Sequence, residues 1–498
     1  MSPSPSTSST NPSIGPLSPH DAVKTMFTKT EKWFIVLLIA FAGLFSPLTA
    51  NIYFPAIPTL SRAFNKSTEL INLTVTMYMI LQGIAPMFWG PVSDHWGRRP
   101  AGAVCLMILS ISCVGLALVP TSDYWLLMVL RCVQAAGSAS TIAIGAGVIG
   151  DISTREERGG FFGVFTLGPM IGPAIGPVIG GVLADRLGWR SIFWFMCIAS
   201  SVCLVVMILL MPETLRSRVL SGKCLPFVHR PLIPVIGKRV NSGLQASNPP
   251  SGQDRPKNPL RLFTFPDILI LLAITALICA VFYGVLASIS TLFETAYPFL
   301  NETTIGLCFM AMGGGMAVGS SINGRVLDFE YQLIKKQQMR RSHDAQEDDF
   351  PIEKARLRLL PMLVLLMSAC CAGYGWCLQK KVNIAVPLIL NVAMGYVSIA
   401  VMNSASTLMI DLVPNQGSSV TGCNNLVRCL LSAAVVSVID LIINGIGVGW
   451  TYVLLSGLSL LSIPLIYIAI RLGPSIRTKR RERLRQVDQS AEKDASQA

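Results

Sequence analysis

The stretch GVFTLGPMIGPAIGPVIGG, residues 163–181, carries no charged side chain and is rich in glycine. It lies within an apolar run from Phe161 to Leu183, close to the roughly 20 residues that a helix needs to cross a bilayer core. Small residues at four-residue spacing let helices approach closely, while Pro173 and Pro177 remove backbone hydrogen bonds and allow bending. The stretch therefore predicts a close-packed, bendable transmembrane helix.

The composition extends this prediction to the whole chain. Of the 498 residues, 52% are hydrophobic and only 13% are charged, against roughly one quarter charged residues in a soluble globular domain. The supply of charged side chains is too small to cover a water-soluble surface. The chain is therefore expected to lie in a membrane, with the lipid bilayer as its surroundings.

Apolar segments of spanning length recur six times before Pro212 and six times after Phe265. They predict an all-α membrane protein with twelve transmembrane helices in two pseudo-symmetric six-helix halves. The expected order is an N-terminal tail, a first half, a central loop, a second half and a basic tail, over residues 1–32, 33–211, 212–265, 266–470 and 471–498.

Basic residues in the connections indicate the orientation. They gather on one side of the predicted membrane, in the connections after spans two and four, in the central loop, in the stretch Lys335–Arg341 and in the C-terminal tail. The positive-inside rule then places both termini in the cytosol and explains the net charge of +13 without nucleic acid as a partner. Asn65 and Asn301 begin Asn-x-Ser/Thr triplets in connections of the opposite side, where they are candidates for glycosylation.

The thirteen cysteines include no CxxC pair, and most lie singly within apolar runs. This pattern favours small packing residues over a metal site, so neither a metal nor a cofactor is expected.

GPVSDHWGRRP, residues 90–100, predicts a tight turn after the second span, with an acid and two guanidinium groups between helix ends. Such charges can pair with neighbouring helix ends and separate when the halves move. The stretch resembles the loop signature of the major facilitator superfamily, with His95 in place of the usual basic residue, and Gly324-Arg325 with Asp328 is a weaker echo in the second half. The matching positions, which the resemblance implies act in gating, are Gly90, Asp94, Gly97, Arg98 and Arg99.

The glycine spacing of the fifth span resembles the antiporter signature of the same superfamily. The resemblance implies the major facilitator fold and exchange rather than symport. The matching residues are Gly163, Gly172, Gly176, Pro177, Gly180 and Gly181.

Polar residues within the spans predict a central cavity. Arg131, Gln134, Ser138 and Thr141 share one face of span four, and a guanidinium inside a bilayer is costly unless it faces partners or water. The sequence around Arg131 is similar to a second superfamily motif, whose arginine is implied to influence proton transfer; a purely structural arginine is the alternative. The predicted substrate and proton-coupling residues are Arg131, Gln134, Arg428, Asn424, Tyr78, Gln82 and Asp151.

Arg428 lies about halfway along span eleven and places a second guanidinium across the pseudo-symmetric cavity. This pair suits an anionic or carbonyl-bearing substrate, whereas a bond to the carbonyls of a neighbouring helix would make Arg428 structural.

No G-x4-GK[ST] phosphate loop is present, so direct coupling to ATP is not expected. The four histidines lie outside the spans, and the remaining acids, Asp151, Glu294, Asp411 and Asp440, lie near helix ends. A proton carrier at mid-depth is therefore not located by the sequence.

Three stretches resemble fungal drug:proton antiporters with twelve spans: PLTANIYFPAI at 47–57, LGWRSIFW at 187–194 and MPET at 211–214. Two more, GAGVIGD at 145–151 and NNLVR at 424–428, resemble the branch of quinidine-resistance proteins and of amino-acid and citrate exporters.

The resemblance implies a secondary transporter that exports drugs, toxins or secondary metabolites by proton antiport with alternating access. An exporter of an organic acid such as citrate is the alternative, and a transporter-fold nutrient sensor is a third. No nucleophile, base and orienting group cluster in the sequence, so an enzyme is not expected. The expected partners are a small-molecule substrate and protons, and the chain is expected to be a monomer in the plasma membrane, with a vacuolar or vesicular membrane as alternatives.

Overall fold

The computed structural model describes residues 27–153, 157–219, 226, 229–233, 259–341, 352–413 and 417–478. Most of both predicted tails and much of the central loop lie outside these ranges, as do Arg155 and Glu156. Within them the elements are helices, and twelve helical segments are long and apolar enough to cross a membrane. The predicted fold class is therefore confirmed.

The first half holds six of these segments. The second, third, fifth and sixth spans are single helices. The first span continues through a short 3-10 turn into α3, and the fourth is broken at Ala139 into two helices. The elements are α2 (Lys29–Asn51), η1 (Phe54–Ala56), α3 (Ile57–Phe64), α4 (Thr68–Trp96), α5 (Arg98–Leu118), α6 (Tyr124–Ser138), α7 (Ser140–Ile152), α8 (Arg158–Leu187) and α9 (Arg190–Leu210), followed by the short α10 (Arg216–Val219).

The second half repeats the arrangement after a short 3-10 turn. Its last span continues beyond α18 to Thr478. The elements are η3 (Pro259–Thr264), α12 (Pro266–Ala296), α13 (Glu302–Arg341), α14 (Ile352–Leu357), α15 (Leu360–Gln379), α16 (Ala385–Leu412), α17 (Gly417–Ile446) and α18 (Val448–Leu460).

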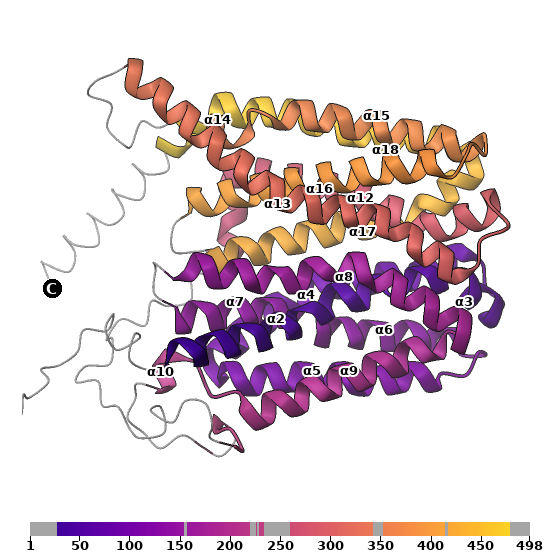
Figure 1. The fold of residues 1–498 in the computed structure, drawn as a ribbon, viewed down its shortest axis with the longest axis horizontal. Coiled ribbons are helices and arrows are strands. Elements are labelled where there is room, and N and C mark those ends of the chain that lie inside the picture. Colours follow the sequence, from indigo (N-terminus) through magenta and orange to yellow (C-terminus); the bar gives the residue numbers. More distant parts are fainter. Residues whose placement is uncertain are drawn as a thin grey trace, which may run out of the picture.

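The two halves lie side by side with their helices along one common direction (Figure 1). One end of the bundle, here called the tail side, is where α2 begins at Lys29 and the last span ends at Thr478. The opposite end, here called the far side, carries α3 (Figure 1). These two terms describe the molecule without assigning either end to a compartment.

Two helix pairs join the halves, α4 with α17 and α8 with α13. In each pair, the second span of one half packs against the fifth span of the other, as a pseudo-twofold relation between the halves requires. Any movement of one half relative to the other must therefore change the packing in these two seams.

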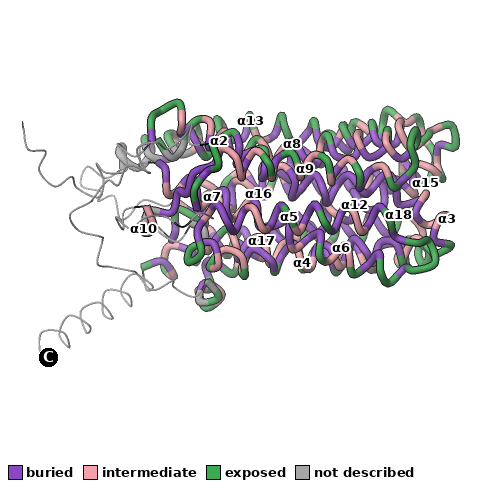
Figure 2. The backbone as a smooth tube through the Cα atoms, turned by 90° about the horizontal axis from the view of Figure 1, so that it is seen from below, coloured by how far each residue is buried: buried purple, intermediate pink, exposed green. Residues whose placement is uncertain are grey.

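Large apolar side chains are exposed on the outside of the bundle. Phe88, Ile111, Trp125 and Ile198 are each more than 60% exposed, on four different helices. Buried and exposed positions alternate along the helices (Figure 2). In water such a surface would be costly, whereas lipid tails are as apolar as these side chains.

The glycines of α8 let this helix approach helices of both halves. A Cβ atom at Gly172 would lie 2.7 Å from Pro47 Cγ, and one at Gly180 would overlap the Ile52 carbonyl oxygen. On another side of α8, a Cβ atom at Gly181 would overlap the Glu302 carbonyl oxygen of α13. The α8 helix remains continuous through its three prolines, Pro169, Pro173 and Pro177.

Two sequence predictions about boundaries were wrong. The turn after the second span was expected from Gly90, but α4 continues through Trp96 and the reversal takes place at Gly97, whose φ of +116° favours glycine. The stretch Lys335–Arg341 was expected in a loop, but it extends α13 to 40 residues. Polar residues at a spanning helix's end can continue the helix into the aqueous phase because the backbone bonds stay satisfied.

The glycine contacts of α8 lead to a prediction about folding. We expect Gly180→Ala to destabilise the protein by about 1–3 kcal/mol, because the new methyl group forces apart two closely packed backbones. Gly163→Ala is the matched control in the same helix, since no atom lies within 4 Å of its Cβ position. Thermal unfolding of both variants in detergent measures the difference, and equal melting temperatures would contradict the packing argument.

Candidate substrate site and gates

Arg131 lies at the centre of the first half and is completely buried. Its guanidinium carbon lies 4.2 Å from the ring centroid of Tyr53 and 4.3 Å from that of Tyr78. Nη1 donates to Gln134 Oε1 at 2.6 Å. The side chain thus links the end of α2 and the middle of α4 to α6.

The aromatic rings take the place of hydrogen-bond acceptors around this cation. Nε and Nη2 of Arg131 are buried and have no hydrogen-bond partner among the described residues. A cation over the face of an aromatic ring gains up to about 2 kcal/mol when it is desolvated. Arg131 is therefore enclosed by its own half in this state, which favours the structural role that the sequence left open.

Tyr78 and Gln134 serve the same enclosed network. The Tyr78 hydroxyl lies 2.7 Å from Ser138 Oγ and donates to the Ser46 carbonyl at 3.3 Å. Gln134 Nε2 donates to Cys113 Sγ at 3.2 Å. Both side chains are buried, so their polar groups are used in holding helices of the first half together.

Arg428 differs from Arg131 because it is only partly buried. It lies near the middle of α17, and its Nε donates to Cys279 Sγ of α12 at 3.5 Å. Among the described residues, no acid lies within ion-pair distance of Arg428, and no acceptor lies within hydrogen-bond distance of its terminal nitrogens. Its outer N–H groups are thus free to bind a ligand.

Tyr283 places Arg428 at the boundary between the halves. This tyrosine of α12 lies within electrostatic range of Arg428 and also of Tyr78, which belongs to the first half. The α4–α17 seam passes beside this region, where Gly83 faces Cys429 and Leu426. Arg428 therefore lies close to the boundary between the two halves.

The asparagines of α17 are occupied by neighbouring helices. Asn424 Oδ1 accepts from Thr275 Oγ1 at 2.7 Å, and its Nδ2 donates to Ser406 Oγ at 3.2 Å. The adjacent Asn425 donates across the seam to the Gln82 carbonyl at 3.0 Å. Asn424 thus braces three helices of the second half. The buried Gln82 Oε1 has no partner among the described residues.

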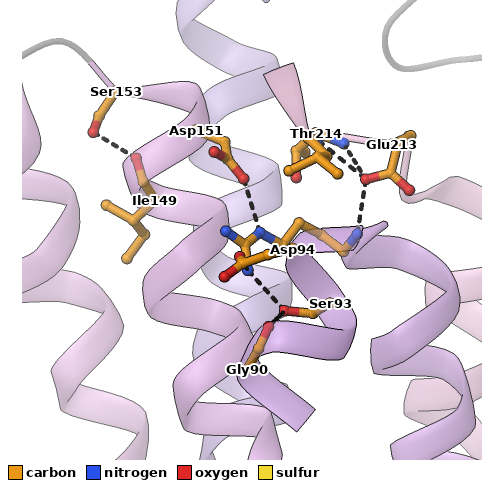
Figure 3. A network of polar contacts seen from close by, with 10 residues as sticks. Gly90, Ser93, Asp94, Ile149, Asp151, Ser153, Glu213 and Thr214 are labelled. Atoms are coloured by element: carbon orange, nitrogen blue, oxygen red, sulfur yellow. Dashed lines mark hydrogen bonds and ion pairs between the residues drawn. The ribbon is translucent and has the colours of Figure 1, made fainter. Parts of the chain in front are cut away.

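Arg98 organises a polar network on the tail side (Figure 3). Its guanidinium contacts Asp94 at 2.6 Å and Asp151 at 2.9 Å. Its backbone N–H donates to Glu213 Oε1 at 2.9 Å, and Ser93 Oγ accepts from Nη1 at 2.7 Å. The network joins the ends of α4, α5 and α7 to the segment after α9.

The structure places Asp151, one of the predicted substrate and proton-coupling residues, in this network. Asp151 pairs with Arg98 at the tail-side end of α7, not with Arg131. Gly147, one turn earlier, leaves room for the guanidinium, because a Cβ atom there would lie 2.5 Å from Arg98 Nη1. Arg99 donates to the Ile208 carbonyl at 2.7 Å and so contacts α9 instead.

The tail-side ion pairs described by the structure each lie within one half. The first half has Lys32–Glu157 besides the Arg98 pairs, and the second has Arg356–Asp411, Arg358–Glu330 and Arg477–Glu353. On this side, no atom lies within 4 Å of a Cβ position at Gly160, Gly163 or Gly324, and all three glycines are exposed.

The far side is different, because polar contacts there join the two halves. Ser290 Oγ of α12 donates to the Phe54 carbonyl at 2.8 Å, and Phe54 stacks on Phe309 of α13 with centroids 6.3 Å apart. Thr59 Oγ1 donates to the Glu302 carboxylate. Arg62 adds looser ion pairs to the carboxylates of Glu294 and Glu302, at 3.5 and 3.9 Å.

Further far-side bonds run between the connections and helix ends. Thr303 Oγ1 donates to Asp185 Oδ2 at 2.6 Å, and Asn444 donates to Glu69 at 2.8 Å. Among the residues that the structure describes, polar contacts between the halves are therefore concentrated on the far side.

Both glycosylation candidates lie on the far side. Asn65 ends α3 in a left-handed conformation, with φ +49°, and is exposed. Asn301 is also exposed, but its Nδ2 donates to Asp185 Oδ2 of the first half at 3.3 Å. Of the two amides, the one at Asn65 has the more open surroundings.

Comparison with known proteins agrees with this architecture. The family model described as Major Facilitator Superfamily matches residues 39–437, which is most of the chain. The chain belongs to the Major Facilitator Superfamily. It is thus a membrane transporter, and the resemblance found in its loop and glycine motifs is confirmed.

Several fungal relatives match this superfamily member over most of its length. Citrate exporter 1 of Aspergillus niger is 37% identical, with 97% of this chain and 93% of that protein covered. Quinidine resistance protein 1 of Saccharomyces cerevisiae is 31% identical, with 93% and 87% covered. The MFS antiporter QDR2 of Candida albicans is 33% identical, with 89% of each chain covered. The predicted branch of the superfamily is therefore confirmed.

Solved structures support the fold. A D-xylose-proton symporter superposes with a TM-score of 0.65 at 15% identity, covering 87% of this chain and 97% of that one. The human organic anion transporter MFSD10 superposes with a TM-score of 0.55 at 18% identity, covering 87% and 99%. At such identities the likeness concerns the fold alone.

The structure also shows functional contacts that sequence analysis missed. Two hydrogen bonds join the halves, one between Asn72 and Asp440 and one between Thr59 and Glu302. Neither pair has a characteristic spacing in the sequence. Polar residues at the far-side end of a span are the only signal that could have indicated them. Tyr283 and Cys279, the neighbours of Arg428, lie in an apolar run of α12 that carries no motif.

The contrast between the two central arginines is testable. We expect Arg131→Ala to lower the free energy of unfolding by about 2–4 kcal/mol, because it removes two desolvated cation–π contacts. Arg428→Ala should cost much less, since Arg428 makes a single long bond to a thiol. Thermal unfolding in detergent compares the two variants, and a larger loss for Arg428→Ala would contradict the assigned roles.

Proposed function

We propose that this transporter exports a small organic acid in exchange for protons. The observation that carries the proposal is the Arg428 guanidinium, which is partly exposed at the centre of the molecule and has free terminal N–H groups. A charged donor kept inside a bilayer without an acid partner marks a substrate pathway. A carboxylate ligand would supply the missing charge, through the two parallel hydrogen bonds that guanidinium groups favour.

The chemistry around Arg428 fits such a ligand. Tyr283 lies within electrostatic range of the guanidinium, and the Cys279 thiol accepts from Nε, which leaves the two terminal nitrogens for a ligand. Asn424 does not compete, since both ends of its amide are bonded to other helices. The name of the Aspergillus niger relative, a citrate exporter, supports this substrate class.

Export follows from an orientation with the tail side in the cytosol, which the distribution of basic residues supports. In this orientation the far-side contacts hold the exterior ends of the two halves together, which suits a state that loads substrate from the cytosol. The far-side contacts must then break, and the tail side must close, for the substrate to leave. This is alternating access about a central site.

The tail-side network would have two roles in this cycle. In the present state it links α4, α5 and α7 within the first half, so that this half moves as one body. The Gly90–Arg99 segment and its echo near Arg325, which the resemblance implies act in gating, would hold the tail side closed in the other state of the cycle, when the far side is open. In that state Arg98 or Arg325 would find acceptors across the α8–α13 and α4–α17 seams.

Drug or toxin export is the second candidate. Two relatives carry quinidine resistance or multidrug transport in their names, which supports it. In the structure, Tyr283 and the partly buried Tyr396 could pack against an aromatic or cationic compound. A free guanidinium disfavours a cationic substrate, and this is why we place the organic acid first.

Location and assembly follow the same reasoning. We propose that the transporter functions as a monomer, because the binding region lies between the halves of one chain. We also propose that it lies in the plasma membrane. Asn65 is the better glycosylation candidate, since the Asn301 amide bonds to Asp185.

Substrate flux tests the role of Arg428. We expect Arg428→Ala to weaken organic-acid binding roughly 10- to 100-fold, corresponding to about 1.5–3 kcal/mol for a charge-assisted hydrogen bond. Citrate-like acids are added outside proteoliposomes that contain a pH-sensitive dye. The uptake of the acid and the accompanying proton movement are then measured together.

The matched control for this flux is Arg471→Ala, an exposed arginine on the tail side. It should transport like the wild type. Drug-driven proton movement that is unaffected by Arg428→Ala would favour the drug exporter instead.

Labelling from one side of the membrane tests the orientation. In a background in which Cys132, Cys197, Cys224 and Cys377 are replaced by serine, Lys66→Cys on the far side and Lys336→Cys on the tail side each introduce one accessible thiol, because both lysines are exposed and the other described cysteines are buried. A membrane-impermeant maleimide added to intact cells should modify the thiol at 66, whereas the thiol at 336 should react only after permeabilisation. The reverse pattern would invert the proposed direction of transport.

A further inference from the structure

One carboxyl group joins the two halves deep within the far-side contact. Asp440, late in α17, accepts a hydrogen bond from Asn72 Nδ2, early in α4, at 2.5 Å. The two side chains are 8% and 1% exposed. This bond lies in the α4–α17 seam, which must open on the far side when the transporter changes state.

Apart from the hydrogen bond from Asn72, the described surroundings of Asp440 offer little stabilisation to a negative charge. No lysine, arginine or histidine among the described residues lies within ion-pair distance of its carboxyl group. The titratable groups that face it are Glu69 of α4, which is itself acidic, and Tyr452 of α18, whose hydroxyl lies 2.7 Å from Ser288 Oγ of α12. Arg428, on the same helix, lies about 18 Å away along its axis.

Asn72 provides a second, independent indication. Its Oδ1 is buried and has no hydrogen-bond partner among the described residues. A protonated carboxyl group has one O–H donor, whereas a carboxylate has none. An acid and an amide can therefore exchange two hydrogen bonds, and protonation of Asp440 would supply the donor that the orphaned amide oxygen lacks.

We propose that Asp440 is a proton-binding site that controls the far-side gate. When the gate is open, water reaches the group and it is a carboxylate; as the gate closes, it takes a proton from the far-side medium to form a neutral O–H. Acid on the far side then favours the state described here. This proposal rests on the proposed function in one respect only: the orientation of the chain decides which compartment supplies the proton.

Thermodynamic linkage sets the sign and size of the effect. A group that binds a proton only in the closed state makes closure more favourable as pH falls, by about tenfold per pH unit across the range in which it titrates. Glu69, near the rim, strengthens the effect because its negative charge repels a second one at Asp440.

Hydrogen exchange of the full chain in lipid nanodiscs, without substrate, tests this gate. We expect the backbone amides of residues 68–78 and 434–446 to become more protected relative to intrinsic exchange as the pH falls from 8 to 5. Asp440→Asn mimics the neutral form and should remain protected at both pH values. Glu69→Gln removes the neighbouring negative charge but keeps Asp440, so the pH dependence should persist with its midpoint shifted to lower pH.

Asn72→Asp provides a second variant if Asp440→Asn does not fold. It places two carboxyl groups together, so the far side should lose protection at pH 8 and regain it at pH 5, when one proton is shared. The proposal would be overturned if protection in the wild type did not change with pH. It would also be overturned if Asp440→Asn showed the same pH dependence as the wild type. Absence of organic-acid exchange in proteoliposomes would refute the proposed function alone, because the hydrogen-exchange experiment contains no substrate.

Discussion

A guanidinium in the interior of a lipid-embedded bundle is the constraint on which the central architecture depends. Its charge is costly to desolvate, so the protein must surround it or leave it facing water. The first half surrounds Arg131 with two tyrosine rings and a glutamine, and this ties α2, α4 and α6 into one body. The second half leaves Arg428 partly exposed with its outer nitrogens free. Two residues of the same type, one in each half, thus have opposite consequences, one for rigidity and one for binding.

Rigid halves also require close packing where they meet, and glycine provides it. The α8 helix carries glycines toward α2 in its own half and toward α13 in the other. The contact with α2 can persist through a cycle, whereas the contact with α13 must change when the halves rotate. The antiporter signature therefore combines a permanent helix contact and a variable one within a single helix.

Much of the fold could be predicted because hydrophobic length and glycine spacing are local properties. The twelve spans, the two halves and the superfamily followed from segments such as residues 163–181 and 90–100. The boundaries at Gly90 and Lys335 were harder, because a polar sequence near a membrane surface suits a helix end and a loop equally well. The pairing of Asp151 with Arg98 was not predicted, since the distance between them depends on how α5 and α7 pack. The Asn72–Asp440 bond joins residues 368 positions apart and has no sequence pattern.

The closed far side has a pharmacological consequence. If that side faces the exterior, a competitive inhibitor dissolved outside the cell meets Ser290, Phe54 and Glu302 in contact and cannot reach Arg428 while this state persists. Such a compound would have to permeate the lipid first or wait for the reverse conformation. Potency measured from outside would then reflect how long the transporter dwells in each state as much as the affinity of the pocket. Poorly permeant acids could thus be excellent cargo and poor blockers at the same time.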